Sequence, residues 1–441
     1  MTSQKHLKQL VRDRMARTGE AYTTARRHVL AKAARDSAPE LPTGLLPGYD
    51  RFGGGQHRLS TLLAHLLRQA GHVAPHTGRP YTEAMLAGLA GGIGFMYAVF
   101  EYQGFPPMMT IVAQHHPEPW LPAALGRLGI GYTEQRSTSA KAALAALHHA
   151  LDDGRPVFCE VDRSKLPWHA DALASYADPF GVVVAGRHEG TLYLEDAAAV
   201  PQPMPEAEFA AAWASYKKGR HHRLTVAPGP VPVDLPAAIR AALAVTVAHL
   251  TGPVLGNSFD VNFGLSGMRR LAEQLRDERG KSAWAKRFAD PVPFFHGVRR
   301  LYECLEEQYT APGATRPLYA DFLDEAAGTP DGRPQWTEAA RLFRESGALW
   351  SRVAHRAAEV CSGLGEYAHL AEQRLVLMMR EGRSAADEIR ALSVRIEQLA
   401  EEYAAGDPLG DAGRRELFGE LADLVDEART VEEAAVESLR E

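Results

Sequence analysis

The feature that most constrains this chain is a glycine-rich segment that runs directly into an apolar helix. Gly53-Gly54-Gly55 precedes Gln56-His57-Arg58-Leu59-Ser60-Thr61, and residues 62–71 continue with helical spacing. Such a junction places a side chain on the first turn of a helix, where free N–H groups and the positive helix end can activate a thiolate or hold an anion. Arg58 occupies that turn, and a guanidinium cannot act as a nucleophile. This one residue limits the chemistry that the segment can perform.

Composition places the chain among ordinary globular proteins. Its 441 residues predict two or three domains, and 45% apolar and 24% charged residues are typical of soluble proteins. The formal net charge of −6 gives no reason, over the whole chain, to expect nucleic-acid binding. No apolar run reaches about 18 residues, and the charged start lacks the apolar stretch of a signal peptide. We therefore expect a soluble, cytoplasmic protein without membrane contact.

Residues 1–38 are expected to form a basic helical extension. Nine basic residues face three acidic ones in residues 1–36, a net charge of +6 that leaves the remainder near −12. An apolar stripe with helical spacing is interrupted at Thr18-Gly19 before a second helical segment. A basic helical pair can bind nucleic acid or an acidic carrier protein. Ordinary charge patterning favours the alternative, a solvated helix packed on the acidic body.

Regular patterns divide the rest of the chain into two domains. The first, residues 45–228, begins with a helical pattern over Leu59–Leu128 that glycines and prolines interrupt. Its further expected elements are a helix over 140–151, a buried strand over 156–161, a hairpin of 181–187 and 191–195, a helix over 209–216 and a strand over 223–226. Helices followed by strands are the layout of an α+β domain. Prolines between 228 and 236 mark its end.

The run Gly88-Leu89-Ala90-Gly91-Gly92-Ile93-Gly94-Phe95 admits two interpretations. A glycine-rich loop can hold a phosphate, but this one follows no expected strand and lacks a Gly-Lys-Ser/Thr ending. The sequence therefore favours the second interpretation, in which the glycines permit close backbone packing beside the active-site cleft.

Residues 236–441 are expected to be all helical. Apolar residues step by three and four over 389–403 and again over 417–435, with a turn at 406–410 between them. These stripes predict a helical hairpin or a short coiled coil. A stripe that faces the core of its own chain is the first expectation. A homodimer interface through these helices is the alternative.

Several of these segments resemble a known family. They are Gln56–Ser60, the glycine run 88–95, Val161-Asp162 with Leu166-Pro167-Trp168, Phe263–Gly267 and Arg316–Ala326. The chain looks similar, from Leu45 to Arg356, to the N-terminal domain of butirosin-biosynthesis protein H and the uncharacterised domain that usually follows it. The resemblance implies an α+β fold, with a papain-like (cysteine-protease-like) domain followed by an all-helical domain. It also implies acyl transfer from a carrier-protein thioester to an aminoglycoside amine.

Two of the three catalytic positions that the resemblance implies are changed. A cysteine is expected after His57, where Arg58 stands, and a histidine at the start of the strand near 182–186, where Phe180 and Gly181 stand. Asp196, after the next strand, retains the acidic position. The catalytic residues therefore stay unknown. The candidate residues of the cleft are Gln56, His57, Arg58, Ser60, Asp162 and Asp196.

Other nucleophiles and metals find little support in the sequence. Cys159 lies within an expected strand, and Cys304 and Cys361 lie in the helical half without Cys-x-x-Cys spacing. Ser60 is better explained as a helix-capping residue than as a nucleophile, because the family's base position is empty. Adjacent histidine pairs such as His148-His149 lack the i, i+4 spacing of zinc-binding helices. No metal and no cofactor is therefore expected.

These features favour a catalytically degenerate relative of the butirosin-type acyltransferases, a binding or accessory protein of specialised metabolism. Its expected partner is an acyl carrier protein, a peptide or a small anionic ligand. The alternative is an active acyltransferase or amide-bond-forming enzyme that uses altered residues on a carrier-protein thioester or a peptide substrate. Arg58 itself has two interpretations. It binds a phosphate or carboxylate in the cleft, or it points to solvent or pairs with Asp196 or Asp178.

Overall fold

The computed structural model describes residues 2–18, 22–36, 40–49, 55–169, 179–196, 198–360, 362–406 and 409–440. Several expectations concern residues outside these ranges: the break at Gly19, the glycines 53 and 54, Asp178, Cys361 and the turn residues 407–408. Within the described ranges, no helix has the length and apolarity that crossing a membrane requires.

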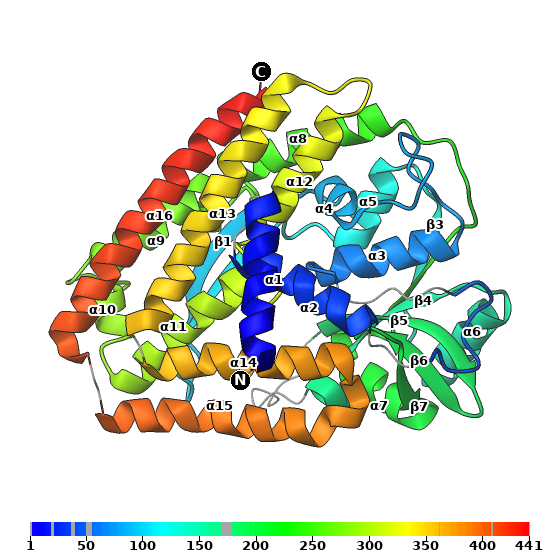
Figure 1. Ribbon diagram of the computed structural model, residues 1–441, viewed down its shortest axis with the longest axis horizontal. Helices are drawn as coiled ribbons and strands as arrows, with labels where there is room; N and C mark the ends of the chain where they lie inside the picture. Colours follow the sequence, from blue (N-terminus) through cyan, green and yellow to red (C-terminus); the bar gives the residue numbers. More distant parts are fainter. Residues whose placement is uncertain are drawn as a thin grey trace.

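A six-stranded antiparallel sheet is the framework of the first half of the chain (Figure 1). Its strands are β3 (Tyr132–Gln135), β4 (Val157–Asp162), β5 (Pro179–His188), β6 (Thr191–Glu195), β7 (Gln202–Pro205) and β8 (Arg223–Val226), in the spatial order β3-β8-β4-β5-β6-β7. The hairpin expected over 181–195 is confirmed, since β5 pairs with β6. Its turn places Glu189 at φ 44° and Gly190 at φ 75°, the two positive φ values that a tight hairpin turn requires.

Alternate residues of the sheet enter two different hydrophobic cores. Phe158 and Val183 belong to the core that contains helix α3 (Arg58–Gln69). Cys159 and Val182 point the other way, toward helices α6 (Ala140–Asp152) and α7 (Glu206–Ser215). This alternation follows from the two-residue period of a strand. Both faces of the sheet are therefore covered, and the α+β class is confirmed.

The expected helical pattern over Leu59–Leu128 is wrong in its middle. Helices α4 (Glu83–Leu89) and α5 (Trp120–Arg127) do form, but β1 (Ile93–Phe100) and β2 (Met108–Gln114) lie between them as an antiparallel pair. The first six residues of β1 are all buried. A strand that is buried on both faces shows no alternation of apolar and polar residues, so its sequence cannot be distinguished from a buried helical segment.

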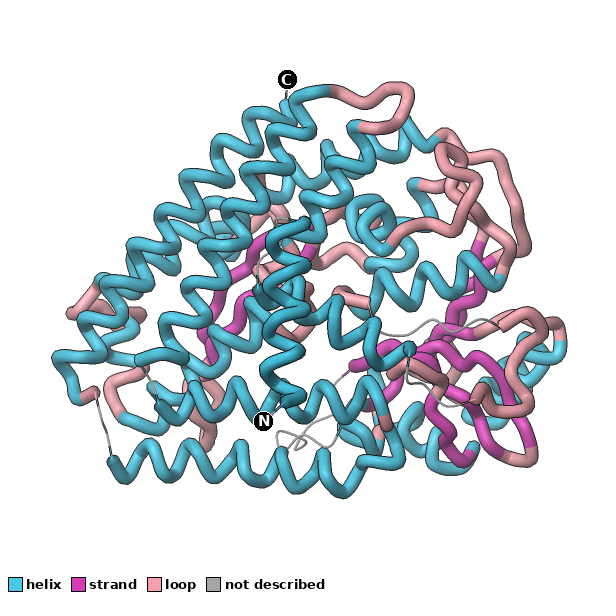
Figure 2. Tube along the Cα trace, in the orientation of Figure 1, coloured by secondary structure: helices cyan, strands magenta, loops and turns pink. Residues whose placement is uncertain are grey.

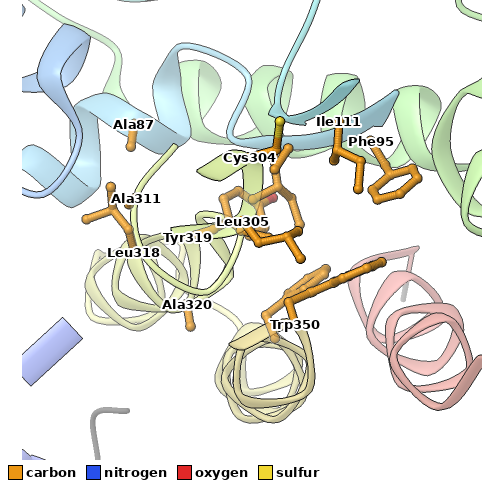
Figure 3. Close-up of a cluster of buried hydrophobic side chains, with 14 of the residues drawn as sticks. Ala87, Phe95, Ile111, Cys304, Leu305, Ala311, Leu318, Tyr319, Ala320 and Trp350 are labelled. Carbon is orange, nitrogen blue, oxygen red and sulfur yellow. The ribbon is translucent and has the colours of Figure 1, made fainter. Parts of the chain in front are cut away.

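The pair of strands β1 and β2 packs within the helical half of the chain. Figure 3 shows Phe95 and Ile111, one from each strand, facing Leu305 and Trp350 of the helical half. The rings of Phe95 and Trp350 stack with centroids 5.2 Å apart. Nearby, the buried hydroxyl of Tyr97 donates to a helical side chain, the Gln274 amide, at 2.8 Å. The two halves therefore share one hydrophobic core.

The glycine run 88–95 serves this contact between the halves. A Cβ atom at Gly88 would lie 2.1 Å from the ring of Phe322, and one at Gly92 would lie 2.3 Å from the ring of Tyr319. Gly92 also has φ of 66°, which side chains rarely adopt. The close packing is confirmed, but it is made against the rings of Phe322 and Tyr319 in the helical half, and none of residues 88–95 lines the pocket described below.

The described residues beyond 234 form helices joined by loops and turns, as expected (Figure 2). The longer helices are α8 (Leu235–Thr251), α9 (Gly264–Arg276), α11 (Pro291–Glu306), α12 (Arg316–Ala327), α13 (Pro334–Val360), α14 (Ser362–Arg380), α15 (Ala386–Gly406) and α16 (Gly410–Arg440), with a short α10 (Trp284–Arg287). The expected hairpin of the last two is wrong. α16 packs along α13 and α9, whereas α15 packs on α14 and α11 (Figure 1). Their apolar stripes do face the core of their own chain, as Ile396 and Leu421 illustrate.

The basic extension forms helices α1 (Thr2–Thr18) and α2 (Tyr22–Asp36), and α2 lies against α14. Val11, Ala25 and Ala34 are buried, and Arg26 forms an ion pair with Glu372 of α14. The extension therefore packs on the body of the protein. Nucleic-acid binding by residues 1–36 stays a prediction.

A buried ion pair joins three helices to β2. The guanidinium of Arg316, at the start of α12, donates to both carboxylate oxygens of Glu432 on α16, at 2.8 and 3.0 Å. Arg316 also donates to the backbone carbonyl of Ala113 in β2 at 2.9 Å, and Trp350 of α13 donates to Glu432 at 2.9 Å. Both charged side chains are fully buried. Such a pair is strongly destabilising to break, because the remaining partner is left as an uncompensated buried charge.

Arg316→Met is expected to lower the free energy of unfolding by about 3–5 kcal/mol for this reason. Urea denaturation followed by circular dichroism measures the change. Arg276→Met is the matched control, because Arg276 also pairs with carboxylates of α16, Asp423 and Asp426, but its side chain is 42% exposed. The control should cost no more than about 1 kcal/mol. Equal losses in the two variants would contradict the special role of the buried pair.

Candidate functional site

A pocket of about 160 Å³ opens beside the start of α3, where three parts of the chain meet. The α+β half supplies Gln56–Leu59, Gln114, Arg163, Trp168, His169, Phe180 and Asp196; α2 supplies Arg27; the helical half supplies Glu307–Thr310, Ala371, Arg374, Leu375 and Met378. Neither half of the chain forms this pocket alone.

His57 fixes the start of α3. Its Nδ1 lies 2.8 Å from the Ser60 hydroxyl and its Nε2 lies 2.6 Å from the Gln114 side-chain carbonyl. Burial lowers the pKa of His57 to about 4, so the ring is neutral near pH 7. Since the Gln114 oxygen can only accept, Nε2 carries the proton and Nδ1 accepts from Ser60. His57 is therefore a capping and positioning residue in this arrangement.

The positive end of α3 is already matched by a carboxylate. Glu83 accepts a hydrogen bond from the His57 backbone N–H at 2.5 Å and one from the Thr61 hydroxyl at 3.0 Å. Burial raises the pKa of Glu83, and these hydrogen bonds oppose that rise. An acidic side chain near a helix N-terminus is favourable. A ligand anion in the pocket would therefore depend on side chains, not on the end of the helix.

Arg58 contacts Phe180 and Gly181, the two residues that stand where the resemblance implies a histidine. Its guanidinium carbon lies 3.6 Å from the centroid of the Phe180 ring, and its Nη1 donates to the Gly181 carbonyl at 2.5 Å. The side chain forms part of the pocket wall. The two changed positions therefore fit each other directly, and Arg58 brings a positive charge to the pocket. The expected alternative of a pair with Asp178 concerns a residue outside the described ranges.

Asp196, the retained acidic residue, is bonded to a histidine that sequence reasoning missed. His169 Nε2 lies 2.5 Å from Asp196 Oδ2, and the indole N–H of Trp168 donates to the same oxygen at 2.9 Å. Burial disfavours ionisation of Asp196, but the charge and hydrogen bond of His169, together with the charge of Arg58, outweigh it and lower the pKa. Its position in the sequence could have pointed to it, since His169 directly follows the Leu166-Pro167-Trp168 segment that carries the resemblance.

The opposite wall adds charges from α2 and the helical half. Arg27 of α2 and Arg374 of α14 flank Glu307. Burial, with the charge of Glu303, raises the pKa of Glu307 to about 7, against the opposing effect of Arg374. Sequence reasoning did not find these residues, because they lie far apart in the chain and no local pattern connects them.

The remaining sequence candidates separate into pocket and non-pocket residues. Gln56 lines the pocket, and its amide nitrogen lies 2.7 Å from Nε2 of His28 on α2. Ser60 is fully buried behind His57. Asp162 caps the turn after β4 and accepts hydrogen bonds from Ser164 and Ser215. The pocket thus brings together Gln56, His57, Arg58 and Asp196, whereas Ser60, which bonds to His57, and Asp162 do not themselves line it.

No thiol or metal cluster contributes to the pocket within the described residues. Cys159 and Cys304 are buried, and burial raises the pKa of each thiol. Neither residue lines the pocket. In the described ranges, no group of three or more histidine, cysteine, aspartate or glutamate side chains is placed to hold a metal ion.

The fold and the pocket thus define a class of protein with two parts. An α+β domain packs against a helical domain, and a charged pocket lies between them. Residues 57–197 match the family model of butirosin biosynthesis protein H, N-terminal, and residues 204–388 match a domain of unknown function (DUF4872). The chain therefore carries a domain that matches the N-terminal domain of butirosin biosynthesis protein H, followed by a DUF4872 domain, and the expected domain pair is confirmed. No curated protein matches the chain.

The buried thiols generate a direct test. In a Cys361→Ser background, native protein should react with Ellman's reagent at pH 7.5 far more slowly than the unfolded protein, because Cys159 and Cys304 are buried with raised thiol pKa values. Urea-unfolded protein, in which both thiols react, provides the reference. Rapid labelling of a native thiol would show that one of them is accessible, contrary to this description.

Proposed function

We propose that this chain is a ligand-binding relative of the butirosin-type acyltransferases, which holds an anionic small molecule in the pocket and no longer performs thiol-based acyl transfer. The observation that carries the proposal is the contact of Arg58 with Phe180 and Gly181. A cationic side chain stands where the family mechanism needs a thiol, and its partners stand where that mechanism needs a base. Covalent catalysis requires both groups in contact.

The charges of the lining support an anionic ligand. Arg27, Arg58, Arg163 and Arg374 line the pocket, against the two carboxyl groups of Asp196 and Glu307. A guanidinium has five N–H donors, so Arg58 can bond a ligand while it remains bonded to Gly181. Guanidinium groups also match the geometry of carboxylates and phosphates.

The apolar part of the lining supports a ligand with an aliphatic portion. Leu59, Ala371, Leu375 and Met378 contribute to the walls. An acyl chain that ends in a carboxylate satisfies both kinds of wall. The family name supports a place in the biosynthesis of specialised metabolites, and an acyl carrier protein or a peptide is the partner that would present such a group. The protein would then act as an accessory that receives or holds the acyl compound.

Arg58→Ala is expected to weaken binding of a small anionic probe by about 1.5–3 kcal/mol, the range for a hydrogen bond to a charged group. S-succinyl-N-acetylcysteamine, a soluble thioester that ends in a carboxylate, is a suitable probe for titration calorimetry. Arg155→Ala is the control, since Arg155 pairs with Asp153 at the surface. Binding that is unchanged in Arg58→Ala would contradict the proposed role of the pocket.

Restoration of the thiol pathway is expected to need two substitutions, Arg58→Cys and Phe180→His. The Phe180 ring contacts the guanidinium of Arg58 and the ring of His169, so a histidine at 180 would face the space that the guanidinium now fills. Gly181→His is less suitable, because a Cβ atom at Gly181 would lie 2.4 Å from the Phe158 ring. Mass spectrometry after mixing with the thioester should detect an acyl group on position 58 in the double variant and none in Arg58→Cys alone. Acylation of the single variant would show that a base is already in place.

A second candidate function is acyl transfer or amide-bond formation by altered residues, on a carrier-protein thioester or a peptide. One observation favours it, the hydrogen bond between His169 and Asp196 in the pocket. An imidazole oriented by a carboxylate is a common general base. Release of thiol from S-succinyl-N-acetylcysteamine by the unmodified protein would distinguish an enzyme from a binding protein.

A further inference from the structure

One cation of the pocket, Arg27, comes from the basic extension. Helix α2 is joined to the segment before α3 by a hydrogen bond between His28 Nε2 and the Gln56 amide nitrogen, 2.7 Å apart, and Arg27 is the residue next to His28. The two family matches cover residues 57–197 and 204–388. The helix that supplies this cation therefore lies outside both matched domains, and its role does not follow from them.

Arg27 differs from other arginines of the pocket in its hydrogen bonds. Arg58 donates to the Gly181 carbonyl, and Arg374 donates to the Ser393 hydroxyl at 3.3 Å. The Nε of Arg27, by contrast, is buried and has no hydrogen-bond partner among the residues that the structure describes. A buried donor without a partner costs free energy. A ligand acceptor at this end of the pocket would remove that cost.

The carboxyl groups around Arg27 do not take the place of such a ligand. Burial lowers the pKa of Arg27, although the charges of Glu83, Glu307 and Glu306 act in the opposite direction. Glu83 already accepts hydrogen bonds at the start of α3. Burial raises the pKa of Glu307 to about 7, so this group is partly protonated near neutral pH. The positive charge of Arg27 is therefore compensated only in part.

Arg58 and Arg27 lie against different elements, and apolar residues complete the lining. Arg58 lies on the ring of Phe180 in β5, whereas Arg27 is near Glu307 at the end of α11. The lining has four guanidinium groups and two carboxyl groups, so its net charge is +2 when both carboxyl groups are ionised and the histidines are neutral. A ligand with an anionic group at each end of an aliphatic chain matches this distribution of charge. The apolar lining residues are Leu59, Ala371, Leu375 and Met378.

We propose that the pocket takes an aliphatic dicarboxylate, and that Arg27 binds the carboxylate at the end remote from Arg58. The inference rests on the proposed binding of an anion at Arg58, and it makes the basic extension part of the binding site. The forked donors of a guanidinium match a carboxylate. A ligand with a single carboxylate would leave one of the two cations without a partner. The pocket should therefore discriminate between a dicarboxylate and its monoamide, which have nearly the same size and shape.

Titration calorimetry at pH 7.5 with succinate, glutarate, adipate and suberate, and with the monoamide of the tightest binder, tests the inference. The unmodified protein should bind that dicarboxylate about 10-fold more tightly than the monoamide, or better. Arg27→Gln should weaken binding of the dicarboxylate by about 10- to 100-fold, the factor expected for a hydrogen bond to a charged group. Binding of the monoamide should be nearly unchanged, so that the preference for the dicarboxylate is lost.

Arg26→Gln is the matched control. Arg26 belongs to the same helix and pairs with Glu372 of α14, but it does not line the pocket. If Arg27→Gln acted only by loosening α2, Arg26→Gln would have the same effect. It should instead leave the preference intact. Arg27→Lys, which keeps the positive charge without the fork, should retain part of the preference even if Arg27→Gln lowers the melting temperature.

Three outcomes would overturn the inference. They are a series in which no dicarboxylate binds more tightly than its monoamide, a preference that survives in Arg27→Gln, and a preference that is lost equally in Arg26→Gln. The proposed function fails separately. If Arg58→Ala weakens binding of both ligands while Arg27→Gln weakens neither, anion binding at Arg58 stands and the role of Arg27 is wrong. If Arg27→Gln removes the preference while Arg58→Ala changes neither affinity, Arg27 binds a carboxylate and the role of Arg58 is wrong.

Discussion

The buried pair of Arg316 and Glu432 links the helical half of the protein to the pocket. Arg316 holds the carbonyl of Ala113 in β2, and the next residue, Gln114, accepts the hydrogen bond from His57. His57 in turn caps the first turn of α3, and Arg58 is the first residue of that helix. Two hydrogen bonds between buried or partly buried groups, joined by the backbone from Ala113 to Gln114, therefore connect α12 and α16 to the wall of the pocket. The helices of the second domain therefore determine where Arg58 stands.

Elements with a local pattern could be predicted from the sequence. The hairpin of β5 and β6 has apolar strands and a Glu-Gly turn, and the short strand β8 lies where the sequence placed it. The pair β1 and β2 could not be predicted, because Ile93–Phe100 is apolar throughout and its burial depends on helices much later in the chain. The predicted hairpin of α15 and α16 was wrong for the same reason. A stripe of apolar residues shows that a helix has a buried face, but it does not identify the helix that covers it.

The residues of the candidate site likewise fall into those that a sequence pattern marks and those that only the packing brings together. Gln56, His57, Arg58 and Asp196 could be placed in one pocket because the resemblance marks their positions, and the structure brings them together. Arg27 and Glu307 could not be placed there from the sequence, because the packing of α2 and the helical half around the start of α3 brings them together. His169 is an intermediate case: its segment was recognised, but only the distance to Asp196 distinguishes it from the many other histidines of the chain.

The burial of β1 and β2 among helices has a consequence for the order of synthesis. The ribosome releases these strands long before α11, α12 and α13, which supply the surfaces that cover them. Until then, two apolar strands remain without their partners, a state that favours aggregation in nascent chains. The first domain therefore cannot complete its core until these later helices have been synthesised, even though its six-stranded sheet is encoded entirely within it. The growing chain must keep this hairpin protected until the second domain has emerged.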